Sequence, residues 1–255
     1  DLVLVARSTA ALDDLARTLS SAHGITATVI SQDLSTPTAA AEVHATLRSG
    51  GIHVDVLVNN AGFNVYGPFA ETDHTEELRM LAVNVVALTS LTKLLLPGML
   101  ARGFGRILNV ASTASFSPAP LDSTYGATKA YVLSFSEALA EELRGTGVTV
   151  TALCPGPTDT DFARRAAMLD TSIFTGRLMT ARDVAAIGYR ALARGKTIAI
   201  AGLANRALVL VIRFSPRALV TRIAKRMLSR QGHAPTTRVL ATNSHGSAPI
   251  RTRPE

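Results

Sequence analysis

Short apolar runs alternate along this chain with segments of helical spacing, and this alternation strongly restricts the possible fold. The apolar runs are rich in β-branched residues and occupy residues 2–6, 26–30, 54–58, 106–110, 148–153 and 197–200. Helical spacing fills the segments 10–22, 38–47, 75–100, 123–143 and 181–193. Strands that are apolar on both faces are typical of a parallel sheet buried between helices. The sequence therefore predicts an α/β fold with a doubly wound parallel sheet in three layers, α/β/α, over residues 1–202.

Composition narrows the class of protein further. The chain has 255 residues, of which 47% are hydrophobic and 18% charged, so it can bury a core. One cysteine, Cys154, excludes a disulfide framework and a multi-cysteine zinc site, and the six histidines show no paired ligand spacing. We therefore predict no metal. A single cysteine and the lack of an uncharged apolar run of about 20 residues favour a cytoplasmic location.

The positive charge is concentrated at one end of the chain. Residues 203–255 contain ten Lys and Arg and one acidic residue, whereas residues 1–202 carry a net charge of −2. Nucleic-acid binding by the folded part is therefore not expected, and aromatic residues make up only 5% of the chain. Residues 243–255 are polar, and we predict a disordered tail over residues 231–255.

The segment 203–230 allows two interpretations. Residues 207–212 are apolar, and Pro216 fits the first turn of a helix that Ser215 would cap. Its apolar side chains are Leu219, Val220, Ile223 and Met227, and its basic ones are Arg222, Lys225 and Arg226. A helix packed on the domain with its charges in water explains this pattern. A basic amphipathic helix on an anionic membrane explains it as well, so peripheral membrane contact remains a second hypothesis.

Polar residues follow most of the predicted strands, and in a doubly wound sheet the carboxyl ends of the strands line the ligand crevice. These residues are Arg7, Ser8, Asp33, Asn59 to Gly62, Ser112, Pro155 and Gly156. Tyr125 and Lys129 are four residues apart on a predicted helix and thus project from one face. A nearby ammonium lowers a phenol pKa, so this tyrosine could exchange a proton with a carbonyl or hydroxyl. A surface Tyr/Lys pair would show the same spacing.

Two further polar residues are candidates for this site. Ser112 stands thirteen residues before Tyr125, and its hydroxyl could polarise the same substrate oxygen, although Thr113 and Ser115 are close competitors. Asn84 lies in an apolar helical run, where a carboxamide needs hydrogen-bond partners. A structurally satisfied core amide explains Asn84 equally well.

In combination these motifs resemble the short-chain dehydrogenase/reductase family over residues 1–202. The matching stretches are Asn59-Asn60-Ala61-Gly62, Asn84, Ser112, Tyr125-x-x-x-Lys129 and Pro155-Gly156-Pro157-Thr158. The resemblance implies a Rossmann-like fold, a small-molecule carbonyl or alcohol substrate, and the homo-oligomers common in the family. It also implies that Tyr125 is the general acid/base, that Lys129 lowers its pKa and binds the nicotinamide ribose, that Ser112 holds the substrate oxygen, and that Asn84 orders a water. The implied cofactor contacts are Asp33 with Leu34 near adenine, Asn60, Ala61 and Gly62 on the adenosine side, and Pro155, Gly156 and Thr158 around the nicotinamide.

The residues after the first apolar run bear on cofactor choice. A dinucleotide fold that prefers NAD carries an acidic residue after its second strand to bind the ribose 2′-hydroxyl. Here that position reads Ala6-Arg7-Ser8. An arginine there could pair with a 2′-phosphate, so we predict NADP(H) in preference to NAD(H). The alternative is an exposed arginine at a helix start.

The chain departs from the family pattern at its beginning. It enters at the expected second strand, so the fold is predicted to be N-terminally incomplete, without the first strand and the glycine-rich turn. That strand would be central, and without it we expect a sheet divided in two and impaired cofactor binding. The predicted function is an NADP(H)-dependent oxidoreductase that interconverts a carbonyl and a secondary alcohol. The alternative is a non-catalytic nucleotide-binding or scaffold protein. Residues 63–69 and 159–179 would set substrate choice, and their apolar side chains suggest an apolar substrate.

Overall fold

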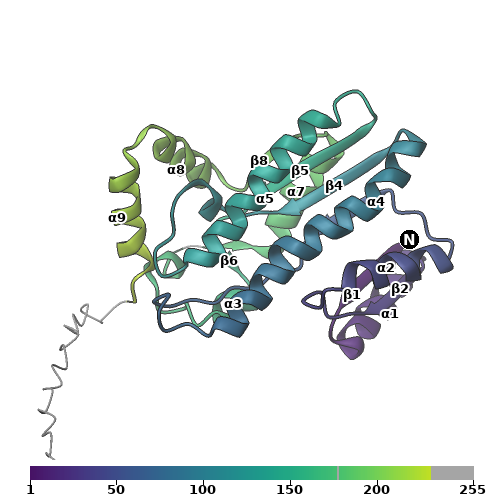
Figure 1. The fold of residues 1–255 in the computed structure, drawn as a ribbon, viewed down its shortest axis with the longest axis horizontal. Coiled ribbons are helices and arrows are strands. Elements are labelled where there is room, and N and C mark those ends of the chain that lie inside the picture. The colour runs from purple at the N-terminus through teal and green to yellow at the C-terminus, as the bar shows by residue number, and fades with distance from the viewer. Residues whose placement is uncertain (177, 231–255) are drawn as a thin grey trace, which may run out of the picture.

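The computed structural model describes residues 1–176 and 178–230. Its larger sheet has four parallel strands in the order β3 (Val56–Asn59), β4 (Gly105–Val110), β5 (Val148–Cys154) and β8 (Ile198–Ile200). Side chains alternate between its two faces. Leu108 and Leu153 pack toward α7 (Ala181–Ala193), while Ile107 and Ala152 pack toward α4 (Leu88–Arg102) and α5 (Ser123–Glu142). The predicted three-layer α/β/α fold is confirmed (Figure 1).

A second parallel sheet pairs β1 (Leu2–Ala6) with β2 (Ala27–Ser31). The helices α1 (Thr9–His23) and α2 (Ala39–Ser49) accompany it, and all four elements gather at the right of Figure 1. Leu91 of α4 joins the core between α2 and this sheet, which connects the two parts of the molecule. Neither β1 nor β3 bonds a further strand among the described residues. The strands thus form two separate sheets, β1-β2 and β3-β4-β5-β8, and the sheet is divided in two as expected.

The predicted helix over residues 75–100 is three consecutive helical pieces. They are α3 (His74–Leu81), the π-helical turn η1 (Ala82–Ala87) and α4. Asp73 caps the start of α3 by accepting the amide of Glu76 at 2.9 Å. By length and hydropathy the run His74–Arg102 could cross a bilayer. In the structure 33% of its apolar window is buried, and Leu91, Thr92 and Met99 of this run pack inside the protein.

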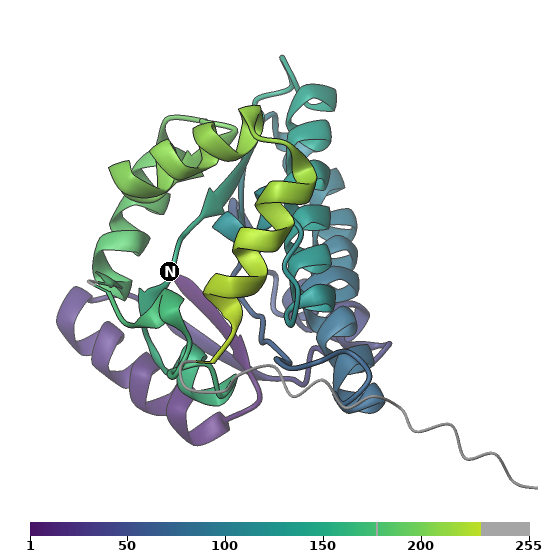
Figure 2. The ribbon, with the colours of Figure 1, turned by 90° about the vertical axis from the view of Figure 1, so that its left-hand side faces the viewer.

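Several elements between β4 and the end of the described chain were not predicted as such. They are η2 (Thr113–Phe116), β6 (Thr158–Asp159), α6 (Asp161–Arg165), η3 (Ser172–Phe174) and β7 (Met179–Thr180). Two helices follow β8, α8 (Leu203–Phe214) and α9 (Arg217–Leu228), and α9 lies in front in Figure 2. The expected cap at Ser215 is wrong. Pro216 takes the cap position of α9, and Ser215 ends α8 in an extended conformation because a residue before proline disfavours the helical one. The predicted tail over residues 231–255 lies outside the described residues.

Candidate active site

The structure brings Tyr125, Lys129 and Ser112 together beside the carboxyl ends of β4 and β5. Tyr125 and Lys129 lie on the first two turns of α5, and both are buried. Lys129 Nζ is 5.6 Å from the centre of the Tyr125 ring and donates to the Val110 carbonyl at 2.8 Å. Ser112 lies two residues beyond the end of β4, and a hydrogen bond of its side chain lowers the pKa of the phenol. The side chains of Tyr125 and Lys129 therefore lie together at the candidate site, as their spacing predicts.

The predicted lowering of the Tyr125 pKa is wrong in direction, and Lys129 is not among the groups that shift it. Burial raises the pKa of the Tyr125 phenol, the nearby Asp122 carboxylate raises it further, and the Ser112 hydrogen bond lowers it only in part. Burial also lowers the pKa of Lys129 to about 8. The physical reason is that desolvation penalises the charged form of each group, whereas the sequence argument considered only their mutual attraction. At neutral pH Tyr125 is therefore a protonated phenol, a proton donor.

Asn84 is fully bonded inside the protein. Its Nδ2 donates to the Phe63 carbonyl at 3.0 Å and to Thr128 Oγ1 at 3.2 Å, and its Oδ1 accepts the Phe63 amide at 3.1 Å. Asn84 lies in η1, and π-helical turns are frequent at functional sites. A Cβ at Gly62 would come within 3.0 Å of Asn84 Oδ1 and 3.6 Å of Lys129 Nζ. The amide thus ties the loop after β3 to α5, which agrees with its structural interpretation.

The residues predicted around the nicotinamide are in part covered by α8. Thr158 Oγ1 donates to the Gly156 carbonyl at 2.9 Å, which closes the turn after β5. A Cβ at Gly156 would lie 2.5 Å from Nδ2 of Asn205, a residue in the first turn of α8. Asn205 donates in turn to the Ala201 carbonyl at 2.6 Å. Sequence reasoning missed Asn205, because no spacing rule connects a strand-end glycine to a residue about fifty positions later.

The residues predicted near the adenine and near a 2′-phosphate lie around the carboxyl ends of β1 and β2. Asp33 accepts the amide and hydroxyl of Ser35 at 2.9 and 2.8 Å and lies 3.8 Å from the Arg79 guanidinium. The Ser35 hydrogen bonds, helped by the charges of Arg7 and Arg79, lower the pKa of Asp33. Ser8 precedes α1, and its hydroxyl makes no capping hydrogen bond. The predicted contact residue Leu34 packs on the α2 core.

Asn60 and Ala61 are exposed just beyond β3. The neighbouring Asn59 is buried and donates to Asn109 Oδ1 at 2.8 Å and to Thr92 Oγ1 at 3.1 Å. Asn59, the first residue of the Asn-Asn-Ala-Gly motif, thus joins β3 to β4 and α4, while the other three residues are exposed at the strand end.

The two segments predicted to set substrate choice meet next to Tyr125. The Phe162 ring lies 5.6 Å from the Tyr125 ring, centre to centre. Asn64 Nδ2 lies 3.1 Å from Met168 Sδ, which links residues 63–69 with residues 159–179. Helix α9 closes over this region, because the Tyr66 hydroxyl donates to the Leu228 carbonyl and Leu228 packs against Met168. The role of α9 was not foreseen.

A buried acidic pair near Tyr125 was also missed. Asp122 and Glu77 are 4% and 8% exposed. Burial, helped by the Glu77 charge and opposed by a hydrogen bond from Asn64, raises the pKa of Asp122 to about 7. Within residues 1–176 and 178–230, no group of three or more His, Cys, Asp or Glu is placed to hold a metal ion.

With this geometry in view, comparison with known proteins identifies the class. The sequence profile of the short chain dehydrogenases matches residues 1–168, and the chain belongs to this family of oxidoreductases. It is similar to the ketoacyl reductase HetN of Nostoc sp., with 43% identity over 103 residues that cover 40% of this chain and 36% of that protein. It is also similar to the very-long-chain 3-oxoacyl-CoA reductase of Bos taurus, with 33% identity over 159 residues, 60% of this chain and 50% of that protein. The chain thus spans about half or less of the length of these curated relatives.

Solved structures agree with the fold. A short-chain dehydrogenase from Sphingobium yanoikuyae in complex with NADPH superposes with a TM-score of 0.74 at 31% identity, covering 92% of this chain and 89% of that one. A short-chain dehydrogenase from Streptomyces avermitilis gives a TM-score of 0.73 at 30% identity, covering 88% and 87%.

Proposed function

We propose that this chain carries the catalytic site of an NADP(H)-dependent oxidoreductase that interconverts a carbonyl and a secondary alcohol. The observation that carries the proposal is the cluster of the buried Tyr125 and Lys129 with the half-buried Ser112 at the strand ends, beside Phe162. A proton donor held beside a second hydroxyl suits protonation of a carbonyl oxygen. The similar proteins described as 3-oxoacyl and ketoacyl reductases support a carbonyl substrate.

The residues present fit the nicotinamide end of the cofactor. A side chain at Gly62 would press on Asn84 Oδ1 at 3.0 Å and lie 3.6 Å from Lys129 Nζ, so the glycine keeps the strand-end loop close to these two residues. Lys129 would hold the nicotinamide ribose, and the turn at Pro155, Gly156 and Thr158 would form the wall of the pocket. When bound, the cofactor supplies the hydride.

The adenosine end favours NADP(H). Arg7 is exposed and the Ser8 hydroxyl makes no capping hydrogen bond, so both are suited to bind a 2′-phosphate. The related Sphingobium yanoikuyae structure contains NADPH. For the pyrophosphate, residues 1–176 and 178–230 contain no glycine-rich turn of the Gly-x-x-x-Gly-x-Gly type, so the fit is confined to the two ends of the cofactor.

The chain's own residues manage the proton. Tyr125 donates its phenolic proton to the substrate oxygen during reduction. Ser112 Oγ already accepts the Ala114 amide at 3.1 Å, so its hydroxyl hydrogen can be donated to the same oxygen. Phe162 covers the phenol and excludes water from it.

We further propose an apolar carbonyl substrate. Near Phe162, apolar side chains of four separate segments form a hydrophobic cluster: Tyr66, Ala119, Ala166, Met168, Ile173, Phe174 and Leu228. Apolar surroundings of this kind favour aliphatic or lipid-like groups.

Two substitutions on α5 test this function. Tyr125→Phe removes the proton donor and should abolish turnover while leaving NADPH binding nearly unchanged. The matched control is Tyr131→Phe, since Tyr131 lies on the same helix, is 40% exposed and contacts only Thr89 through its hydroxyl, at 3.0 Å. Turnover is followed by NADPH absorbance with a panel of apolar ketones, and binding is followed by calorimetry. Turnover that survives Tyr125→Phe would refute the catalytic role. Cofactor binding without turnover in the unaltered chain would favour the non-catalytic alternative, and preference for NADH would reject NADP(H).

A further inference from the structure

Helix α8 presents its apolar stripe away from the domain. Leu203, Leu210, Val211 and Phe214 are 81%, 59%, 61% and 80% exposed. With the exposed Ala207 they recur at i, i+4, i+7, i+8 and i+11, which is one face of an α-helix. None of the residues of α8 is buried. A helix that covers a core turns such a stripe inward, so the stripe of α8 is built to meet something outside the domain.

Helix α9 extends this surface while remaining anchored to the domain. Leu219, Ile223 and Met227 follow each other at intervals of four residues and are 46%, 46% and 41% exposed. The opposite side of α9 is fixed, because Leu228 is buried and the adjacent Arg230 pairs with Asp170 at 3.3 Å. The outer ridge is therefore held in place.

The surface around these stripes is cationic without balancing acids. Residues 203–230 contain seven Lys and Arg and no Asp or Glu: Arg206, Arg213, Arg217, Arg222, Lys225, Arg226 and Arg230. Within the described part of the chain, Arg230 is the one member of this set with an ion pair. The spacing places Arg206 and Arg213 along one border of the α8 stripe and Arg222 and Arg226 along one border of the α9 ridge.

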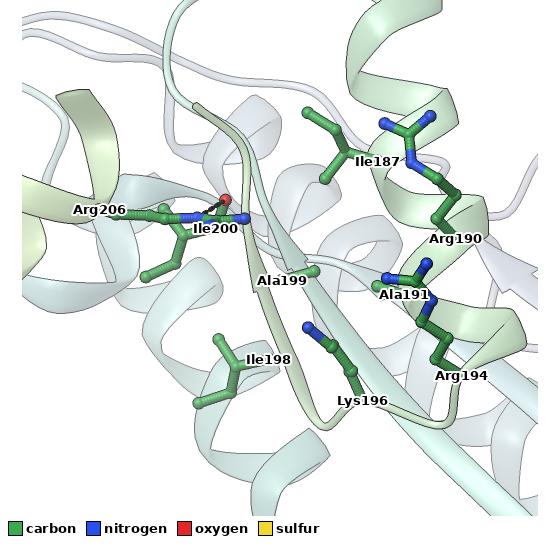
Figure 3. Close-up of a pocket in the computed structure, with 9 residues that line it drawn as sticks. All are labelled: Ile187, Arg190, Ala191, Arg194, Lys196, Ile198, Ala199, Ile200 and Arg206. Atoms are coloured by element: carbon green, nitrogen blue, oxygen red, sulfur yellow. Dashed lines mark hydrogen bonds between the residues drawn. The ribbon is translucent and has the colours of Figure 1, made fainter. Parts of the chain in front are cut away.

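A basic hollow adjoins α8 on the side of Arg206. It has a volume of about 420 Å³ and lies over β8, between α7 and α8 (Figure 3). Arg190, Arg194, Lys196 and Arg206 line it, and its lining contains no acidic residue. Arg206 thus belongs both to the hollow and to the border of the apolar stripe, and its Nε donates to the Ile200 carbonyl at 3.1 Å.

The occupant of this surface must combine an apolar interior with a negatively charged exterior. We propose that α8 and α9 form a docking surface for a bilayer that contains anionic phospholipids. The apolar stripe of α8 enters the acyl boundary, and the bordering cations bind headgroup phosphates. A second copy of the chain is a poor occupant, since it would bring seven like charges against seven.

The absence of tryptophan from the chain provides a direct test. Phe214→Trp introduces a single reporter at a stripe position that is 80% exposed, and Leu15→Trp places a matched reporter on α1, where Leu15 is 45% exposed. These helices lie at opposite ends of the molecule (Figure 1). We expect tryptophan emission to shift to the blue for Phe214→Trp on phosphatidylcholine vesicles containing about one third phosphatidylglycerol. The Leu15→Trp protein should show no shift.

A second set of variants, which removes positive charge, distinguishes lipid docking from other contacts. Each basic residue near an anionic surface contributes about 1 kcal/mol, or about fivefold in partitioning. Arg206→Gln with Arg213→Gln in the Phe214→Trp protein should therefore weaken vesicle binding about 25-fold, while the control pair Arg17→Gln and Arg48→Gln leaves it unchanged.

Three results would overturn the proposal. The first is no blue shift of the Phe214→Trp protein on the anionic vesicles, and the second is an equal shift on pure phosphatidylcholine. The third is a shift without vesicles that grows with protein concentration, which would assign the surface to a second copy.

Discussion

The buried carboxyl of Asp122 should make the stability of the fold depend on pH. This carboxyl is 4% exposed, and its Oδ1 has no hydrogen-bond partner in the structure. Burial raises its pKa from 3.8 to about 7, and the neighbouring Glu77 contributes in the same direction. Because the folded protein binds this proton more tightly than the unfolded chain, the resulting stability is present at low pH. It is lost as the pH rises from about 4 through 7.

The size of the effect follows from that shift. One pKa unit corresponds to about 1.4 kcal/mol. Between pH 5 and pH 7.5 the carboxyl passes from mostly protonated to mostly ionised in the fold, while it stays ionised in the unfolded chain. The free energy of unfolding should therefore fall by about 2 to 3 kcal/mol across this interval on account of Asp122 alone. Asp122→Asn keeps the shape and removes the charge, so this part of the pH dependence should disappear.

Urea denaturation followed by far-ultraviolet circular dichroism measures the effect. The quantity of interest is the difference between Asp122→Asn and the unaltered chain at pH 5 and at pH 7.5, because contributions from other groups cancel in it. Asp159→Asn, an exposed carboxylate near the same site, is the control and should leave the interval unchanged. If the unaltered chain and Asp122→Asn lose the same stability between the two pH values, the burial argument for this carboxyl is wrong.

Two further substitutions test the packing that supports the site. Asn84→Ala removes three hydrogen bonds and leaves the Phe63 amide and carbonyl without those partners. It should therefore lower the free energy of unfolding by about 3 kcal/mol. Asn60→Ala, at the exposed strand end, should change this free energy by less than about 0.5 kcal/mol. Met99→Ala empties a fully buried position in the core under α4 and should cost about 2 to 5 kcal/mol, against less than about 1 kcal/mol for Leu100→Ala, which is 39% exposed. Urea denaturation measures both pairs, and equal losses within a pair would contradict the burial assigned here.

The layered fold was predictable because its pattern is local. Runs such as 106–110 and 148–153 are apolar on both faces, and only a sheet covered on both sides satisfies them. Interruptions within a helical run were harder to predict. The run 75–100 looks uniformly helical, yet a π-helical turn interrupts it at Ala82–Ala87, where Asn84 bonds the distant Phe63 backbone. Such a turn depends on tertiary contacts that helical periodicity does not encode.

The candidate site was predictable in its membership but not in its electrostatics. Parallel strands end at one edge, so Ser112 and the turn at Pro155 necessarily come close to Tyr125 and Lys129. The predicted shift of the Tyr125 pKa is reversed by burial, with the Phe162 ring against the phenol, and by the charge of Asp122. Neither residue is marked by a motif, because each is placed by the way separate segments pack.

The opposite shifts of Asp122 and Lys129 define how the site is charged near neutral pH. Burial raises the pKa of Asp122 and lowers that of Lys129, so both groups titrate closer to neutral pH than usual, while Tyr125 keeps its proton. Below about pH 7 the protonation of Asp122 removes a charge that raises the pKa of Tyr125, so the phenol becomes a stronger acid as the solution becomes more acidic. The same change removes the charge next to Glu77 and stabilises the fold. In the proposed reaction, acidification should therefore favour carbonyl reduction in two ways, through a more acidic donor and through a more stable site around it.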